Sequence, residues 1–238
     1  MQKRLIALVT AVLLLPGCAN AQPTDDLIPA LEQLAIEGNP EAVYHIGMAY
    51  QTGAGVGRDA AKALEAFRRA ADLGDVLGSY KLGCFYDGQG EGLVPNDPEL
   101  ALQHKLVAAE AGYALAQQDV AALYAAKGEI GKAVEWLERA MLQGWADALA
   151  TYASVHNGAE GVEPDPVRTA AYFRLFLART EASEDQRAWL DEFEEKMSPE
   201  QQRRAAEIVR TYQPAPTPIT LKALAGQRAA LELLARAS

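Results

Sequence analysis

Residues 51–60 read QTGAGVGRDA, with three glycines at alternate positions followed by an arginine and an aspartate. Glycine-rich loops can bind phosphate, because their backbone N–H groups approach an anion without interference from side chains. A nucleotide-binding loop follows a strand, and the P-loop type ends in Gly-Lys-Ser/Thr. Here a helical pattern precedes Gly53, and Lys62 is not followed by Ser or Thr. We therefore predict no nucleotide site and interpret the glycines as a turn between two helices.

The three histidines are the residues best suited to bind a metal or to act as a general base. None of them has a His or Cys neighbour at the two- or four-residue spacing of a zinc site, so we predict no metal. His104 and His156 fall at positions that are aromatic in other copies of the repeat described below, which favours a packing role. His45 alone lies off the apolar stripe of its predicted helix, where its side chain can face a ligand.

Nucleophiles and carboxylate pairs give no catalytic arrangement. No serine has an identifiable base and orienting group, and Cys84 falls at a small packing position of the repeat. Acidic pairs such as Glu194-Glu195 are more typical of a solvated surface than of an acid–base pair. The sequence therefore predicts no catalytic residue, no cofactor and no enzyme.

The composition indicates a packed helical protein. Of the 238 residues, 50 % are hydrophobic and 23 % are charged, alanine is abundant throughout, and alternating apolar–polar runs are lacking. The net charge of −10 argues against nucleic acid as a partner, because the chain has no basic stripe to displace counterions from phosphates.

The first 17 residues have the pattern of a signal peptide. Lys3 and Arg4 precede an apolar run over residues 5–15, which is too short to span a bilayer as a mature helix. The following Leu-Pro-Gly-Cys resembles the lipobox of bacterial lipoproteins, which implies lipidation of Cys18. Ala19 in place of aspartate implies sorting to the outer membrane, facing the periplasm. The alternative is an ordinary secretory signal with Cys18 incidental.

Four similar segments follow one another along the chain, at 42–74, 78–112, 116–144 and 148–180. Between the first two, Ile46-Gly47 falls on Leu82-Gly83 and Tyr50 falls on Tyr86, an offset of 36 positions. Within each copy, apolar and small residues recur at helical spacing. A single helix pair cannot bury its apolar face, so stacked pairs with capped ends are expected.

This pattern closely resembles the Sel-one-like repeat family, relatives of the tetratricopeptide repeats. The first copy carries the residues of the family unit: Ala42, Gly47, Tyr50, Gly53, Gly55, Val56, Asp59, Lys62, Ala63, Phe67, Ala70, Ala71 and Gly74. The third copy has lost the glycine connector, and the fourth has Thr180 where the closing glycine belongs. The resemblance implies an all-α protein, a right-handed α/α superhelix of about four helix-pair repeats with flanking capping helices.

The expected organisation follows from these patterns. A signal peptide (1–17) and a tether (18–26) precede a solenoid over 27–212, with repeats at about 39–74, 75–112, 113–144 and 145–180. Two capping helices follow at 183–212, opened by capping boxes at Ser183 and Ser198, with Trp189, Phe193 and Ile208 among the inward residues. A proline-rich linker (213–219) leads to an amphipathic helix at 220–238, with Gly226 as a weak point. This helix either folds back on the superhelix, the simpler expectation, or docks on a partner.

The resemblance also implies a protein–protein interaction module whose concave face is lined by the first helix of each pair. Exposed aromatics and methionine are residue types that anchor interfaces. The candidate partner-binding residues lie just off the core stripe of these helices: Tyr44, His45, Met48, Gln51, Tyr80, Lys81, Asp87 and Gln118.

Three functions are consistent with these observations. The leading one is an envelope lipoprotein, anchored in the membrane through Cys18, that binds a protein partner and no nucleotide. The second is an immunity protein that neutralises an antibacterial effector, such as a phospholipase, delivered to the periplasm. The third is a β-lactamase-like hydrolase, which the family resemblance disfavours because the paired cysteines of such members are missing here.

Overall fold

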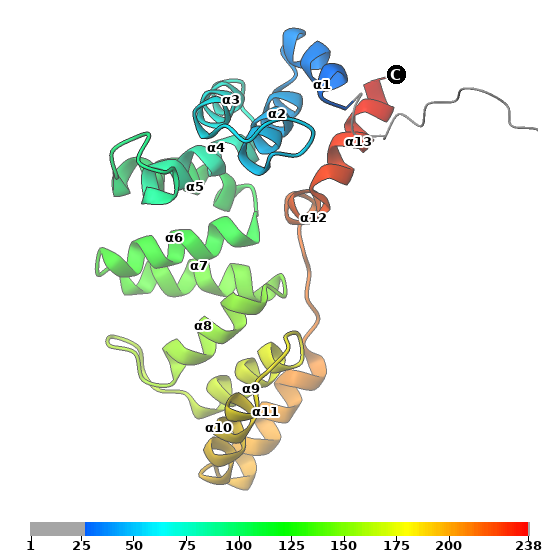
Figure 1. The fold of residues 1–238 in the computed structure, drawn as a ribbon. Helices are drawn as coiled ribbons and strands as arrows, with labels where there is room; N and C mark the ends of the chain where they lie inside the picture. Colours follow the sequence, from blue (N-terminus) through cyan, green and yellow to red (C-terminus); the bar gives the residue numbers. More distant parts are fainter. Residues whose placement is uncertain (1–26, 238) are drawn as a thin grey trace, which may run out of the picture.

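The computed structural model describes residues 27–237, so the predicted signal peptide, the tether and Cys18 lie outside the described residues. The described part of the chain is entirely helical, with no strand (Figure 1). Its α-helices are α1 (Leu27–Ile36), α2 (Pro40–Thr52), α3 (Ala60–Asp72), α4 (Val76–Cys84), α5 (Pro98–Glu110), α6 (Ala114–Ala126), α7 (Ile130–Leu142), α8 (Ala146–His156), α9 (Pro166–Leu177), α10 (Glu184–Glu195), α11 (Pro199–Thr211), α12 (Pro218–Ala225) and α13 (Gln227–Ala237). A short π-helical turn, η1 (Phe85–Gln89), follows α4 directly.

The helices form four consecutive pairs, α2–α3, α4–α5, α6–α7 and α8–α9, each packed against the next. We call the first helix of a pair its A helix and the second its B helix. The stacked pairs form an arc, with α1 at one end and α10–α11 at the other (Figure 1). The predicted all-α solenoid is thus confirmed.

The connectors within the pairs explain the glycines of the sequence. Gly53 ends α2 in the left-handed conformation, with φ of 81°, which costs glycine no steric penalty. The side chain of Asp59 then accepts a hydrogen bond from the backbone N–H of Lys62 and caps α3. Asp97 and Asp165 cap α5 and α9 in the same way. The glycine-rich stretch is therefore a helix–helix turn, as predicted.

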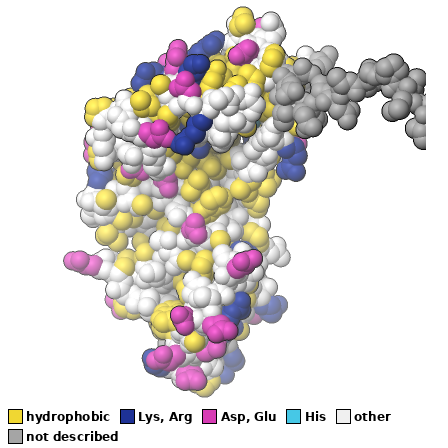
Figure 2. Space-filling view, viewed as in Figure 1, with side chains coloured by type: hydrophobic (Ala, Val, Ile, Leu, Met, Phe, Trp, Pro, Cys, Tyr) yellow, Lys and Arg dark blue, Asp and Glu magenta, His cyan; other side chains and the backbone are white. Residues whose placement is uncertain are grey.

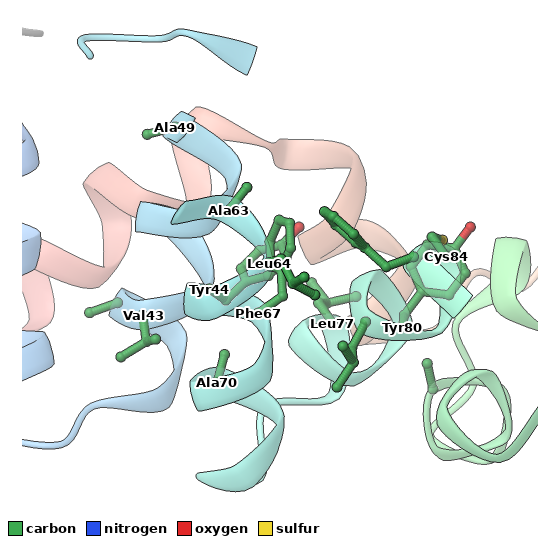
Figure 3. Close-up of a cluster of buried hydrophobic side chains, with 14 of the residues drawn as sticks. Val43, Tyr44, Ala49, Ala63, Leu64, Phe67, Ala70, Leu77, Tyr80 and Cys84 are labelled. Carbon is green, nitrogen blue, oxygen red and sulfur yellow. The ribbon is translucent and has the colours of Figure 1, made fainter. Parts of the chain in front are cut away.

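Close packing within a pair depends on small residues of the A helix. Phe67 of α3 is completely buried, and a Cβ atom built on Gly47 of α2 would lie 2.6 Å from its ring. Figure 3 shows Phe67 among Tyr44 and Leu64 in the core of the first repeat. Larger side chains at Gly47 would push the two helices apart, which costs packing energy.

The far end of the arc is closed by α10 and α11. Both predicted capping boxes are present, at Ser183 with Gln186 and at Ser198 with Gln201. The prediction that Trp189 faces inward is wrong, because its side chain is 39 % exposed. The next residue of α10, Leu190, takes the buried position against α9 instead.

The C-terminal segment differs from the single helix predicted over 220–238. Gly226, with φ of 55° and ψ of −124°, breaks it into α12 and α13, because this conformation is open almost only to glycine. The pair folds back along one side of the arc, and α13 packs against α1 and α2 at the opposite end from α11 (Figure 1). We call α12 and α13 the C-terminal helix pair.

A hydrogen-bond network joins the C-terminal segment to the turns between repeats. The side chain of Gln143, after α7, donates to the carbonyl of Gly112 at 2.7 Å and accepts from the backbone N–H of Thr217 at 3.0 Å. The hydroxyl of Thr220 donates to the Gln143 side chain at 2.7 Å and accepts from the Ala114 N–H at 3.0 Å. These bonds satisfy buried polar groups that lie far apart in the sequence.

Candidate partner-binding face

The eight predicted binding residues all lie on A helices or on η1. Each A helix has positions equivalent to those of Tyr44, His45, Met48 and Gln51 on α2. We call the surface that these positions form on α2, α4, α6 and α8 the A-helix face. The eight residues do not form one exposed patch, because their burial differs along the solenoid.

The first-repeat part of the A-helix face is covered by the chain itself. Tyr44 and His45 are only 7 % and 6 % exposed, so the expectation that they present an open surface is wrong. Together with Met48, which is half-buried, they border a cavity of about 310 Å³ that α1 and the C-terminal helix pair enclose. The C-terminal helix pair thus occupies the surface predicted for a partner.

An ion pair holds this contact. Lys222 of α12 lies 2.8 Å from the carboxylate of Glu41, and Arg236 of α13 lies 3.6 Å from it. Burial opposes the ionisation of Glu41, but His45 and Lys222 outweigh that cost and lower the pKa of the carboxyl to about 2. Glu41 is therefore ionised at neutral pH and attracts the C-terminal cations.

A charged cluster lies in the middle of the A-helix face. Lys105 of α5 is 1 % exposed, and its ammonium group lies 2.6 Å from Asp87 and 2.8 Å from Asp119. The hydroxyl of Tyr80 donates to Asp119 at 3.1 Å. Tyr80 is buried, contrary to the expectation of an exposed aromatic, because its ring packs edge-on against Tyr113. We call these residues the Lys105 cluster.

Neither Lys105 nor Asp119 was among the predicted residues. In the repeat alignment, Lys105 takes the position of Phe67 and Leu137, both of which are buried in the core of their pairs. A cation at a core position is the signal that could have identified the site. Gly83 makes room for it, because a Cβ atom there would lie 2.8 Å from the Lys105 side chain.

The electrostatics of the Lys105 cluster suit binding better than covalent chemistry. Burial opposes the charge of Lys105, but the hydrogen bonds to Asp119 and Asp87 outweigh it and raise the pKa of the lysine. Burial raises the pKa of Tyr80 and of the Cys84 thiol, so both stay protonated at neutral pH. A protonated thiol is a poor nucleophile, and the two carboxylates remain partly exposed, 31 % for Asp87 and 21 % for Asp119.

The A helices of the last two repeats leave their face open. Gln118 of α6 is half-buried, while Ala122 beside it and Thr151 of α8 are exposed. Between α6, α7 and α8 lies an apolar crevice of about 240 Å³, bordered by Gln118, Ala122 and Val155. Figure 2 shows hydrophobic side chains across the middle of the visible face, with charged side chains gathered toward both ends.

The other histidines pack against aromatic rings, in line with the alignment. His104 stacks on Tyr86 with ring centroids 5.7 Å apart, and His156 contacts Tyr152 edge-on at 4.5 Å. Among residues 27–237, no three His, Cys, Asp or Glu side chains gather in a way that would hold a metal ion. In the same range, no helix is both long and apolar enough to cross a membrane.

Comparison with solved structures concerns the fold. The chain is similar to a Sel1 repeat protein from Oxalobacter formigenes, with 21 % identity, 81 % of each chain covered and a TM-score of 0.63. It also resembles c5321, a protective antigen of uropathogenic Escherichia coli with an SLR fold, at 24 % identity, 87 % coverage of this chain, 49 % of that one, and a TM-score of 0.48. A third similar structure is the immunity protein Pa5087 from Pseudomonas aeruginosa, at 20 % identity, 67 % and 76 % coverage and a TM-score of 0.36.

No curated protein sequence matches the chain. The sequence model of the Sel1 repeat matches it four times, at residues 40–75, 77–113, 116–145 and 146–177. Sel1 repeats are protein-interaction modules, and their fold is generally a non-catalytic scaffold. Because the four matches cover more than half of its residues, the chain belongs to the Sel1 repeat family.

Proposed function

We propose that this protein is an adaptor of the bacterial envelope that binds a protein partner through its A-helix face. Membership of a family of interaction modules supports binding to a protein. The lipobox-like sequence before Cys18 supports a lipid anchor, with the solenoid facing the periplasm.

The observation that carries the proposal is the Lys105 cluster. A buried cation paired with two carboxylates is weak evidence for stability, because apolar residues of similar volume often serve as well or better. The equivalent residues Phe67 and Leu137 show that this fold fills the position with apolar side chains. The cluster carries one positive and two negative charges, and its carboxylates reach the surface, so it suits a cationic group on a partner.

Affinity capture from the envelope of the producing bacterium, followed by mass spectrometry, tests this proposal. The tagged chain should retain one or a few specific proteins, and Asp87→Asn should reduce their recovery because it removes charge but keeps the size of the side chain. Glu65→Gln, an equivalent change on the exposed side of α3, serves as the control. Recovery of bulk envelope proteins only would contradict the proposal.

The identity of a captured protein would decide between the two binding roles. A secreted antibacterial effector would make the chain an immunity protein, and the acidic net charge of −10 would favour a basic effector. A resident envelope protein would make it a scaffold. Labelling with a fatty-acid analogue, lost in Cys18→Ser, would test the anchor independently.

A further inference from the structure

The contact between the C-terminal helix pair and the first repeat is incompletely packed. The cavity of about 310 Å³ beside Tyr44 and His45 lies within this contact, with α1 on its other side. The apolar side chains that the C-terminal helix pair contributes to its lining are small, those of Ala223 and Ala230. A cavity of this size lacks the dispersion contacts that larger side chains would make. The helix α13 therefore occupies the A-helix face without filling it.

The polar atoms of this contact are also poorly matched. The Oε1 atom of Glu41 and the Nε2 atom of His45 are buried, and neither has a hydrogen-bond partner among residues 27–237. Arg236 of α13 lies 3.6 Å from Glu41 Oε1, and His45 Nε2 lies 3.7 Å from it, both beyond hydrogen-bond distance. Buried polar atoms without hydrogen bonds are costly. A helix with a better-placed donor would therefore bind this surface more tightly than α13 does.

The two helices of the C-terminal pair are held differently. Thr220 of α12 is buried in the hydrogen-bond network of Gln143, which fixes α12 to the turns between repeats. Gly226 then separates the helices, and a Cβ atom built on it would meet nothing within 4 Å. A rotation at this glycine moves α13 while α12 stays in place. The residues that α13 buries are Ala229, Ala230 and Leu233.

Resting on the proposed function, we propose that α13 is a displaceable internal ligand of the first repeat, and that an amphipathic helix of the protein partner takes its place. The partner helix has about three turns, because α13 is 11 residues long. At the position of Ala230 it carries a leucine-sized side chain, which fills the cavity. At the position of Arg236 it carries a cation that reaches Glu41, whose carboxylate already attracts Lys222.

The covalent link of α13 to the solenoid restricts which ligands can displace it. A segment of the same chain acts at an effective concentration on the order of millimolar, so a free helix of equal affinity binds poorly. A partner helix must gain affinity from the cavity and from Glu41. The C-terminal helix pair thus excludes apolar helices that lack this chemistry from the A-helix face of the first repeat.

Two synthetic peptides of residues 218–237, each mixed with the chain and followed by fluorescence anisotropy, test the proposal. The cavity peptide carries Ala223→Leu and Ala230→Leu. The control peptide has the same composition but carries Ala235→Leu and Ala237→Leu, at exposed positions of α13. The cavity peptide should bind about tenfold more tightly, because only its leucines enter the cavity.

Two substitutions in the chain itself locate the binding. Ala230→Leu gives α13 the larger side chain that the cavity accepts, so it should slow hydrogen exchange in α13 and weaken binding of the cavity peptide about tenfold. Ala235 is exposed on α13 and does not border the cavity. Ala235→Leu is therefore the matched control and should change neither measurement.

Equal binding of the two peptides, or equal effects of the two chain variants, would overturn the inference. Unchanged hydrogen exchange in Ala230→Leu would also overturn it, because the cavity would then not accept a larger side chain. Concentration-dependent self-association with exchange of C-terminal helix pairs would do the same, since a second copy would be the occupant. A captured envelope partner that Ala230→Leu still binds would leave the proposed function standing without this displacement. Absence of any captured partner would instead count against the proposed function.

Discussion

At the scale of single residues, Lys105 shows how one substitution changes a repeat. In two other pairs the same position carries Phe67 or Leu137, whereas here a cation reaches past Gly83 to two carboxylates. The repeat tolerates this because every charge is partnered, since an unpaired charge in the core would be far more costly.

Lys105→Met should lower the free energy of unfolding by about 2 to 4 kcal/mol, because it leaves Asp87 and Asp119 without their shared cation. Partial exposure of the two carboxylates places the value at the low end of the range for buried pairs. Adding Asp87→Asn and Asp119→Asn should restore most of the loss. Urea unfolding of the single and triple variants measures this, and a single variant as stable as the natural chain would contradict it.

Glu41 gives a pH-dependent contribution to stability. Its pKa falls from 4.5 to about 2 on folding, so its stabilising effect is complete above pH 4.5 and is lost as the pH falls through 2. Glu41→Gln should therefore be less stable than the natural chain at neutral pH and equally stable near pH 2. Unfolding curves across this range test the sign, and a difference that grows on acidification would refute it.

At the scale of elements, the helices that repeat were predictable, and the C-terminal segment folds back as expected, but its division into two helices and the surface on which it docks were not predicted. Gly53, Asp59 and their counterparts fix each A–B turn through local conformation and capping, so the sequence alone locates them. The apolar pattern of residues 220–238 shows only that a helix has something to bury. It does not reveal that the surface it buries is α2, nearly 180 positions earlier.

The candidate site was likewise predictable only in part. The alignment identified which positions form the A-helix face, but Tyr44 and His45 are buried beside α1 and the C-terminal helix pair. Tyr80 is buried against Tyr113, at the start of the next repeat. Asp119 was missed because its role depends on Lys105 of the preceding helix pair. Repeat patterns predict equivalence between copies, whereas burial depends on what lies against each copy.

Only one face of α13 packs against the first repeats. Leu233 is 6 % exposed and belongs to the core of the first repeats, while Leu231 on the same helix is 45 % exposed. Leu233→Asp should lower the free energy of unfolding by about 2 kcal/mol or more, because a carboxylate would be buried among apolar side chains. It should also speed proteolysis within residues 213–217. The control Leu231→Asp should do neither, and similar behaviour of both variants would contradict the docking.

At the scale of the whole molecule, the C-terminal segment adds contacts between repeats that are not neighbours in the solenoid. Repeats in a solenoid contact only their neighbours, so distant repeats are coupled weakly. Here the Gln143 network ties the C-terminal segment to the turns before α6 and after α7, and α13 contacts α2 of the first repeat. The closed arrangement adds long-range contacts that couple its two ends.

Truncation after Tyr212 should separate the stabilities of the two ends. Hydrogen exchange followed by mass spectrometry should show faster exchange in α1–α3, which lose their cover, and little change in α9–α11. In the full chain, the two regions should lose protection together as denaturant is added. A uniform change over all helices after truncation would show that the C-terminal helix pair does not act selectively on the first repeat.

The contact between α1 and α13 determines how far each end of the solenoid would lie from a membrane that anchors the chain. Eight residues lie between Cys18 and Leu27, so a lipid on that cysteine would hold α1 within about 30 Å of the bilayer. The carboxyl-terminal helix would lie at a similar distance, and α10–α11, at the opposite end of the arc, would project farthest from the membrane (Figure 1). The apolar crevice between α6, α7 and α8 would then lie between these two heights, within reach of a partner that approaches from the aqueous side.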